Sequence, residues 1–250
     1  MTIKRSLVRA AERILGVRFV KPSRVAVLFE EYHLKRFLSY FDVDCVFDVG
    51  ANTGQYATAL RDHMGFRGQI ISFEPNPVAA EQLRVKSASD PLWHVEELAL
   101  DTVQGQTQFN VMESNQFSSL LKPDNSSIGI FSQLNKIERT VVVSTSTVAI
   151  ELSRFQQKFQ FKRPFLKMDT QGHDLAVAKG AGDSISEFVG LQSELGIRTI
   201  YEGAPNYRAT LDYYHEKGFL LSAFVPNNEG HFPDLVEIDC IMYNGGISKQ

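Results

Sequence analysis

Cys45-Val46-Phe47-Asp48-Val49-Gly50-Ala51-Asn52-Thr53-Gly54 is the stretch that decides the fold. A short apolar run that ends in glycine, followed by a helical pattern over about 54–64, is typical of a strand that turns into a helix. Two more strands are predicted close behind, at 68–74 and 93–98, with a helix over about 77–86 between them. Strands that alternate with helices in this way predict βαβ units and a parallel sheet.

The same alternation returns in the second half of the chain. Strands are predicted at 164–169 and 188–194, and each is followed by a helical pattern, over 173–179 and 207–217. Beyond them, two apolar runs flank a turn-rich link and predict an antiparallel hairpin at the edge of the sheet, formed by 219–225 and 235–243. Between the two halves, strands are expected at 107–112 and 139–144, and the polar stretch over 113–136 is long enough for a lid.

Two helical patterns precede the sheet, over 3–15 and about 23–40, and predict an N-terminal helical extension, 1–42, before an α/β domain, 43–250. Residues 1–24 hold seven Lys and Arg residues and one Glu. This basic segment could rest on an anionic membrane surface, but its apolar stripe lacks Trp and Phe. Packing on the sheet or on a second subunit, as in a homodimer, is therefore favoured over peripheral membrane contact.

The overall composition excludes several classes of protein. The 250 residues are 43% hydrophobic and 22% charged, which is ordinary for a globular protein and argues against disorder. A formal net charge of −3 argues against nucleic acid as the main partner, because phosphate neutralisation needs a basic face. The two cysteines are far apart in apolar runs, and neither a signal peptide nor an apolar span of about 20 residues is present. We expect a soluble, cytoplasmic protein.

Polar and small residues stand where the first two predicted strands end. Gly50 and Gly54 would let the backbone turn tightly after the first strand, and Glu74 ends the second. Ligands of open parallel sheets bind outside the carboxyl ends of the strands, and a carboxylate there can accept hydrogen bonds from both hydroxyls of a ribose. The pairing predicts a nucleoside-binding crevice, although the glycines could also merely shape the turn.

The residues between the glycines narrow the choice of nucleoside. A dinucleotide fold needs a glycine at the position of Asn52, whose side chain would crowd a pyrophosphate. The charge of Asp48 repels phosphate and suits a cationic ligand. S-adenosylmethionine has a ribose, an ammonium and a sulfonium but no phosphate, so it fits better than NAD. The alternatives are an oxidoreductase that uses NAD or a nucleotide sugar, and a non-catalytic cofactor-binding protein.

Several spaced motifs resemble one known family. They are Val46-Phe47-Asp48-Val49-Gly50-Ala51-Asn52-Thr53-Gly54, Ser72-Phe73-Glu74-Pro75-Asn76-Pro77, Ala99-Leu100, Phe165-Leu166-Lys167-Met168-Asp169-Thr170-Gln171-Gly172, Gln192-Ser193-Glu194-Leu195 and Tyr201-Glu202-Gly203-Ala204. The chain is similar over about 43–243 to the FkbM family of S-adenosylmethionine-dependent methyltransferases. The resemblance implies a class I methyltransferase fold, a Rossmann-like, seven-stranded, mostly parallel sheet with an antiparallel terminal hairpin. It also implies methyl transfer to a hydroxyl, usually on a sugar or a polyketide-type natural product.

The resemblance assigns the cofactor-binding positions. Glu74 would hold the ribose, Ala99 and Leu100 would border the adenine, and the loop after the first strand would line the amino-acid half of the cofactor. The complete set is Asp48, Gly50, Ala51, Asn52, Gly54, Gln55, Glu74, Asn76, Ala99 and Leu100. The chain departs from the family at Gln171 and near Ser146 and Thr147, where members commonly have acidic residues, and both departures concern the acceptor side.

Methyl transfer to a hydroxyl requires either a base or a metal to activate the oxygen. Asp169 and Glu194 end two neighbouring predicted strands, and His173 follows at the start of a helix. We predict Asp169, His173 and Lys167 as catalytic residues, with Lys167 pairing with Asp169 or orienting the acceptor. Asp169 and Glu194 could also bind a divalent metal such as Mg²⁺. Helix capping by Asp169 is the structural alternative.

A small-molecule or glycan acceptor is the expected partner. Tyrosine faces stack on sugar rings and arginines bind acidic substituents, so Tyr201, Tyr207 and Arg208 are the predicted acceptor-binding residues. Packing of these aromatic side chains on the sheet is the alternative interpretation. The loop that contains Asn115, Ser118 and Ser119 is predicted to close over the substrates.

Overall fold

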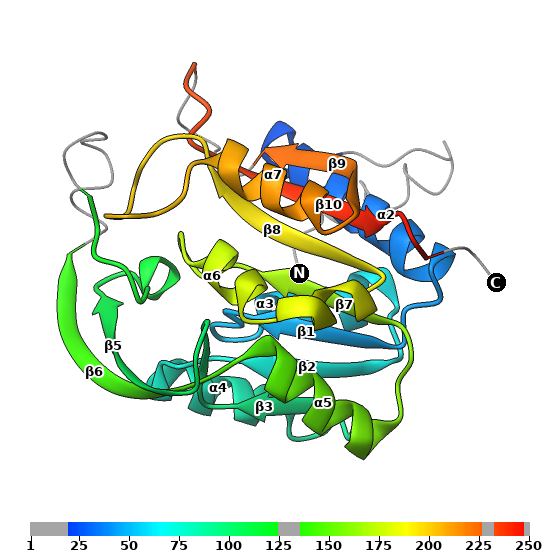
Figure 1. The fold of residues 1–250 in the computed structure, drawn as a ribbon, viewed down its shortest axis with the longest axis horizontal. Helices are drawn as coiled ribbons and strands as arrows, with labels where there is room; N and C mark the ends of the chain where they lie inside the picture. The colour runs from blue at the N-terminus through cyan, green and yellow to red at the C-terminus, as the bar shows by residue number, and fades with distance from the viewer. Residues whose placement is uncertain (1–19, 125–135, 227–232, 248–250) are drawn as a thin grey trace, which may run out of the picture.

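The computed structural model describes residues 20–124, 136–226 and 233–247, and their central feature is a seven-stranded sheet (Figure 1). The strands lie in the order β3-β2-β1-β7-β8-β10-β9. Their bounds are β1 Cys45–Val49, β2 Gln69–Phe73, β3 Trp93–Glu96, β7 Pro164–Met168, β8 Gly190–Gly196, β9 Phe219–Pro226 and β10 Glu237–Asn244. The predicted basic helix over 3–15 and the link that follows residue 226 lie outside the described residues.

The sheet is parallel except at one end. β1, β2, β3, β7 and β8 run parallel to one another, whereas β10 pairs antiparallel with both β8 and β9. The seven-stranded, mostly parallel sheet that the resemblance implies is therefore confirmed, together with its antiparallel terminal hairpin. The last strand of the chain does not form the edge of the sheet, because β10 lies between β8 and β9.

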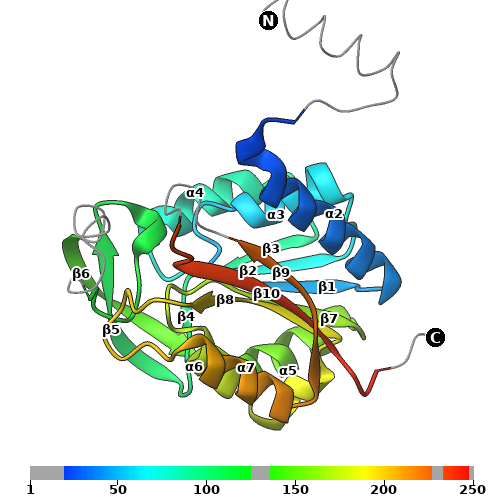
Figure 2. The same ribbon diagram turned by 90° about the horizontal axis from the view of Figure 1, so that it is seen from above.

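Helices cover both faces of the sheet (Figure 2). One face carries α2, α3 and α4, and the other carries α5, α6 and α7. The bounds are α2 Val25–Tyr40, α3 Gln55–Ala59, α4 Pro77–Ser87, α5 Val148–Phe159, α6 Asp174–Lys179 and α7 Tyr207–Glu216. A π-helical turn, Leu60–Met64, continues α3, and shorter 3-10 turns occur at Pro22–Arg24, Asn115–Phe117 and Gly182–Glu187. Among the helices of the described residues, none has the length and apolar composition to cross a membrane.

Polar side chains fix where three of these helices begin. The side-chain oxygens of Asn76, Thr147 and Asn206 accept hydrogen bonds from backbone N–H groups in the first turns of α4, α5 and α7. Such caps satisfy donors that have no partner within the helix. Proline at the first position of α4 adds to the signal, since its fixed φ suits a helix start and it has no N–H to satisfy.

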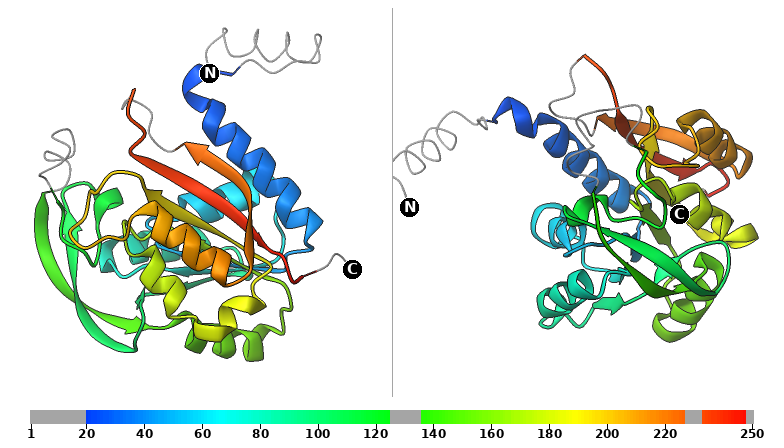
Figure 3. Two further views of the ribbon diagram at one scale, coloured as in Figure 1. Left: turned by 45° about the horizontal axis from the view of Figure 1, so that its top comes forward. Right: turned by 90° about the vertical axis from the view of Figure 1, so that its left-hand side faces the viewer.

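A second, three-stranded sheet stands at the carboxyl ends of the parallel strands (Figure 3). It contains β4 Ala99–Leu100, β6 Ile137–Ser146 and β5 Gly105–Met112, in the order β4-β6-β5. β5 and β6 form a long antiparallel pair, drawn in green in Figure 3, that crosses in front of the strand ends. The strands predicted at 107–112 and 139–144 therefore exist, but they lie outside the main sheet. Helix α5 between β6 and β7 was not predicted.

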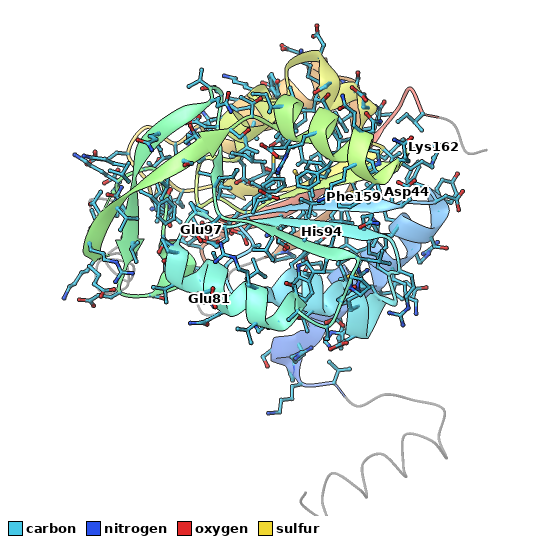
Figure 4. The ribbon with its side chains drawn as sticks, turned by 90° about the horizontal axis from the view of Figure 1, so that it is seen from below. Asp44, Glu81, His94, Glu97, Phe159 and Lys162 are labelled. Atoms are coloured by element: carbon cyan, nitrogen blue, oxygen red, sulfur yellow. The ribbon has the colours of Figure 1, made fainter. Side chains whose placement is uncertain are left out.

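Apolar side chains fill both spaces between the sheet and its helices. Under α5, α6 and α7 the core contains Phe47, Phe73 and Phe155, and on the opposite face Leu34 and Phe37 of α2 pack with Val46 and other strand residues. The described part of the expected N-terminal extension thus belongs to the main core. Near the β3 edge of the sheet, the His94 ring stacks on Phe159 at a centroid distance of 4.3 Å (Figure 4).

Candidate active site

The carboxyl ends of β1, β2, β7 and β8 open into a cavity of about 660 Å³. The order of the strands reverses at β1, which has β2 on one side and β7 on the other, and ligands of doubly wound sheets bind at such a point. Helices α2 and α3 and the loop after β5 line the remaining sides, through Glu30, Tyr56, Phe117 and other residues.

The loop over 50–54 begins with a glycine that no other residue can replace without strain. Gly50 has φ +75°, and a Cβ atom at this position would lie 1.9 Å from the backbone oxygen of Asp169. The missing side chain therefore allows the end of β1 to lie directly against the end of β7. This contact brings the loop and Asp169 together on one side of the cavity.

Gly54, which the motif assigns to cofactor binding, has a packing role in the structure. Its φ is +84°, and a Cβ atom there would lie 2.7 Å from Leu83 of α4 and 3.0 Å from the ring of Trp93. Gly54 does not line the cavity, whereas Gly50, Ala51, Asn52 and Gln55 do. At this position the glycine shapes the turn and permits close packing of the loop on α4 and β3.

Glu74 is held in place by two backbone groups. Its Oε2 accepts a hydrogen bond from the Asn52 N–H at 2.7 Å, and its Oε1 accepts one from the Asn76 N–H at 2.8 Å. Only 6% of Glu74 is exposed, and burial raises its pKa to about 7 even though both N–H groups favour the ionised form. The Asn76 side chain caps α4 and does not line the cavity, so Asn76 contributes through its backbone.

Asp48 and Lys167 form a buried ion pair beside the cavity. The Lys167 Nζ lies 3.2 Å from Asp48 Oδ1 and 3.7 Å from Asp169 Oδ2. Asp48 is fully buried, also accepts a hydrogen bond from the Ser72 hydroxyl, and does not line the cavity, whereas Lys167 does. Burial disfavours the charged ammonium, but the charges of Asp48 and Asp169 outweigh this effect and raise the pKa of Lys167. Lys167 is therefore a permanent cation, and its pairing with Asp169 matches the prediction.

Gln171 connects the two strand-end carboxylates. Its Nε2 donates to Asp169 Oδ1 and to Glu194 Oε2, both at 2.9 Å, and its Oε1 accepts a hydrogen bond from the Tyr201 hydroxyl at 2.8 Å. The Asp169 side chain is 43% exposed, whereas Glu194 is 8% exposed. Burial, and after it the charges of Glu237 and Asp169, raise the pKa of Glu194 well above its ordinary value.

This arrangement does not support the predicted metal site at Asp169 and Glu194. A metal needs lone pairs directed at one point, whereas here an amide directs two N–H groups at the two carboxylates. Among the residues that the structure describes, no group of three or more His, Cys, Asp or Glu side chains is placed to hold a metal ion. The site instead contains a hydrogen-bonded Asp169 that faces the cavity.

His173 has a carboxylate partner that sequence analysis did not identify. Its Nε2 lies 3.0 Å from Oδ1 of Asp101, the residue that directly follows β4. His173 lines the cavity, and it stands immediately before α6. Asp174, the first residue of α6, has a structural role. Its Oδ1 accepts hydrogen bonds from the N–H and the hydroxyl of Thr170, and its Oδ2 accepts them from the Ser193 hydroxyl and the Glu194 N–H.

Three further carboxylates line the cavity at its β8 and β10 end. They belong to Glu237 and Asp239 of β10 and to Glu30 of α2. Asp239 lies opposite Glu194 in the antiparallel ladder. Sequence analysis missed all three, although acidic residues at alternate positions of an apolar run, as in Glu237-Ile238-Asp239, place both on one face of a strand.

The predicted acceptor-binding residues lie away from the cavity. Tyr207 and Arg208 are at the start of α7 and contact one another through the Tyr207 hydroxyl. Tyr201 is buried and contacts Gln171, so it supports the site without lining the cavity. Of the predicted lid, Gln116, Phe117, Ser118 and Leu120 do line it, and the Ser119 hydroxyl donates to the backbone oxygen of Gln171 at 2.8 Å.

Comparisons with known proteins give one family match. Residues 48–221 match the Methyltransferase FkbM domain. No curated protein matches the chain.

Three solved structures with a similar fold are distant in sequence. A methyltransferase FkbM from Methylobacillus flagellatus KT is 14% identical, with a TM-score of 0.46 over 81% of this chain and 44% of that one. The O-methyltransferase from Bacillus cereus in complex with SAH is 9% identical, with a TM-score of 0.46 over 95% and 89%. Aeropyrum pernix fibrillarin with natively bound S-adenosyl-L-methionine is 11% identical, with a TM-score of 0.43 over 86% and 73%. This chain thus spans less than half the length of the first of these structures.

Proposed function

The chain belongs to the FkbM family of methyltransferases, which use S-adenosylmethionine, and from this we propose that it methylates a hydroxyl group of a sugar, in a glycan or a glycosylated natural product. One observation carries the proposal. A carboxylate suited to a ribose, Glu74, and a half-exposed carboxylate suited to accept a proton, Asp169, line the same cavity.

The residues around Glu74 fit the nucleoside part of the cofactor. Each carboxylate oxygen accepts one backbone N–H, which leaves a lone pair on both oxygens for the two ribose hydroxyls. Ala99 and Leu100 supply an apolar wall for the adenine. When bound, S-adenosylmethionine supplies an electrophilic methyl group on a sulfonium centre.

Asp169 is the best placed base for the acceptor hydroxyl. Gln171 holds one of its oxygens, and Lys167 lies near the other. These contacts fix the orientation of the carboxylate while its exposed side faces the cavity, where an acceptor O–H could donate to it. Lys167 cannot take the proton, since it remains charged, and its part is to position Asp169.

His173 is the second candidate for the base. Its contact with Asp101 would fix the tautomer of the imidazole, as a carboxylate does for many catalytic histidines. Asp169 is preferred because it lies at the end of β7, directly against the loop over 50–54.

Titration calorimetry with S-adenosylhomocysteine, and separately with NAD(H), tests the cofactor assignment. We expect binding of S-adenosylhomocysteine alone, weakened about tenfold or more in Glu74→Gln because an amide NH2 replaces one of the two acceptor oxygens. Glu81→Gln, which changes an exposed glutamate of α4, should bind like the wild type. Binding of NAD(H) in place of S-adenosylhomocysteine would overturn the proposed function.

A methyl-transfer assay over a panel of hydroxylated sugars tests the reaction and the base. Asp169→Asn should lower turnover by about 10²–10⁴-fold, which is the usual contribution of a general base, and should leave S-adenosylhomocysteine binding intact. Asp183→Asn, at an exposed position in the turn before β8, is the matched control. Equal turnover in Asp169→Asn and the wild type would assign the base to His173 instead.

A further inference from the structure

Four carboxyl groups line the end of the cavity beyond Asp169. Glu194 comes from β8, Glu237 and Asp239 from β10, and Glu30 from α2. These groups disfavour one another's ionisation. Burial has the largest effect on the pKa of Glu194 and of Asp239 and raises both. The charges of Glu237 and Asp169 raise the pKa of Glu194 further, and those of Glu30 and Asp169 raise that of Asp239.

Glu30 accepts a hydrogen bond from Gln192 at 2.6 Å, and Glu194 accepts one from Gln171. Lys167 lowers the pKa of Asp239 by its charge, but burial has the larger, opposite effect. Among the described lining residues, Lys167 lies nearest to Asp48 and Asp169, and Arg24 pairs with Glu31. Glu237 and Asp239 have no hydrogen-bond or ion-pair partner among the residues that the structure describes. Both carboxylates lie in the cavity wall, so a bound ligand can reach them.

Unpaired carboxylates in a protein wall destabilise the fold, because the charged form loses its hydration without gaining a partner. An amide or apolar side chain at Glu237 or Asp239 would avoid this penalty and still fit the strand. Carboxylates without a partner are therefore expected where a ligand of opposite charge completes the site. Burial raises the pKa of Glu237 to about 7, as expected for a carboxylate that has no cation beside it.

We propose that the acceptor carries a protonated amine next to the hydroxyl that is methylated, and that this ammonium group binds Glu194, Glu237 and Asp239. The inference rests on the proposed function and names the class of its substrate, an amino sugar or a related amino alcohol. An ammonium has three N–H donors and can therefore contact three carboxylates at once.

The order of strands places the proposed ammonium site far from Glu74 and close to Asp169. Glu74 ends β2, whereas β10 lies four strands away, which is about 19 Å at the usual strand spacing. Asp169 follows β7 directly and Glu194 lies in the neighbouring β8, next to the paired residues Met168 and Ser193, so the two are about 5 Å apart by the same measure. A hydroxyl at Asp169 and an ammonium at Glu194 therefore fit adjacent carbon atoms of one sugar ring.

Matched sugars that differ at one substituent test this inference. Calorimetric titrations of the S-adenosylhomocysteine-saturated protein would use glucosamine, glucose, N-acetylglucosamine and glucuronic acid near neutral pH. We expect glucosamine to bind about tenfold or more tightly than glucose and N-acetylglucosamine, and glucuronic acid to bind least. The double variant Glu237→Gln/Asp239→Asn should lose the preference for the amine, whereas Glu81→Gln should keep it.

A second measurement separates a binding site from a structural one. If the carboxyl groups serve a ligand, the double variant should be more stable to urea than the free wild-type protein at pH 8, because the folded wild type disfavours ionisation of both groups and the amides carry no such cost. A less stable variant, equal affinity for the sugars, or no binding of glucosamine would each overturn the inference. The proposed function fails separately, through absence of S-adenosylhomocysteine binding in the first step of the same titration.

Discussion

Glu74 keeps its proton at pH values at which an exposed glutamate has lost it. Burial raises its folded-state pKa from 4.5 to about 7, with Lys167 acting against the shift and Asp48 with it. The folded protein therefore binds more protons than the unfolded chain between these values, and the free energy of unfolding falls as the pH rises through this range. The contribution of Glu74 to this loss is about 3 kcal/mol.

Urea unfolding of the wild type and Glu74→Gln between pH 4.5 and 8 measures this effect. Because glutamine does not titrate, the stability of the variant relative to the wild type should improve with pH by about 3 kcal/mol. Other buried carboxylates, Glu237 among them, titrate in both proteins and cancel in the comparison. A difference that stays constant with pH would show that the pKa of Glu74 is not raised.

Gln171 holds two carboxyl groups of the cavity wall, those of Asp169 and Glu194, through one amide. We expect Gln171→Glu to destabilise the protein by about 2–4 kcal/mol at neutral pH, because two hydrogen bonds donated to carboxylates become repulsions. The loss should shrink at pH 5, because burial raises the pKa of Glu194 well above its ordinary value and its carboxyl group is protonated there. Gln157→Glu, on the exposed side of α5, should change stability by no more than about 0.5 kcal/mol. Urea unfolding at both pH values checks all three expectations.

The predicted site residues that line the cavity owe their position to local geometry. Gly50, Asn52 and Glu74 follow strand ends that a short pattern reveals, and the structure brings them to one cavity. Glu237 and Asp239 could not be identified in this way. Their place depends on which strand β10 pairs with, and a strand pattern does not specify its neighbour. Asp101 was missed for the same reason, since β4 belongs to the second sheet.

At the scale of elements, the contact between β1 and β7 depends on one glycine. Gly50→Ala should destabilise the protein by about 3–5 kcal/mol and abolish S-adenosylhomocysteine binding, since the new methyl group meets the Asp169 carbonyl at a positive φ. Gly65→Ala is a matched control, because Gly65 has φ +72° and no atom within 4 Å of the new Cβ. It should cost only about 1 kcal/mol and leave binding unchanged. Comparable effects of the two substitutions in urea unfolding would contradict this account.

Elements of the main sheet were predicted well where helix and strand patterns alternate regularly. The pattern over 45–96 gave three strands and two helices that the structure reproduces within a few residues. The region over 105–159 was predicted less completely. β5 and β6 form a separate sheet and α5 follows β6 after a single residue, Thr147, so no turn signal separates the strand from the helix. A single sequence shows that a segment is extended, but not which sheet it joins.

On the scale of the whole molecule, ligand binding should connect the two sheets. The cavity is lined both by the loop over 50–54 and by Gln116, Phe117 and Leu120 from the loop after β5. Hydrogen exchange should therefore slow at both segments when S-adenosylhomocysteine and an acceptor sugar are bound together. Helix α7 does not line the cavity, so its exchange rates should stay unchanged. Slower exchange in the first segment alone would place the loop after β5 outside the bound complex.

The position of β10 between β8 and β9 has a consequence for the newly made protein. The ribosome completes β10 last, at about 5–20 residues per second, so β8 waits roughly 2–10 s for the neighbour that covers its edge. During this interval the nascent chain already contains the loop over 50–54 and Glu74 but lacks Glu237 and Asp239 of the cavity wall. Its exposed strand edges could pair with other chains. Chaperone protection is therefore needed most in the interval before β10 leaves the ribosome.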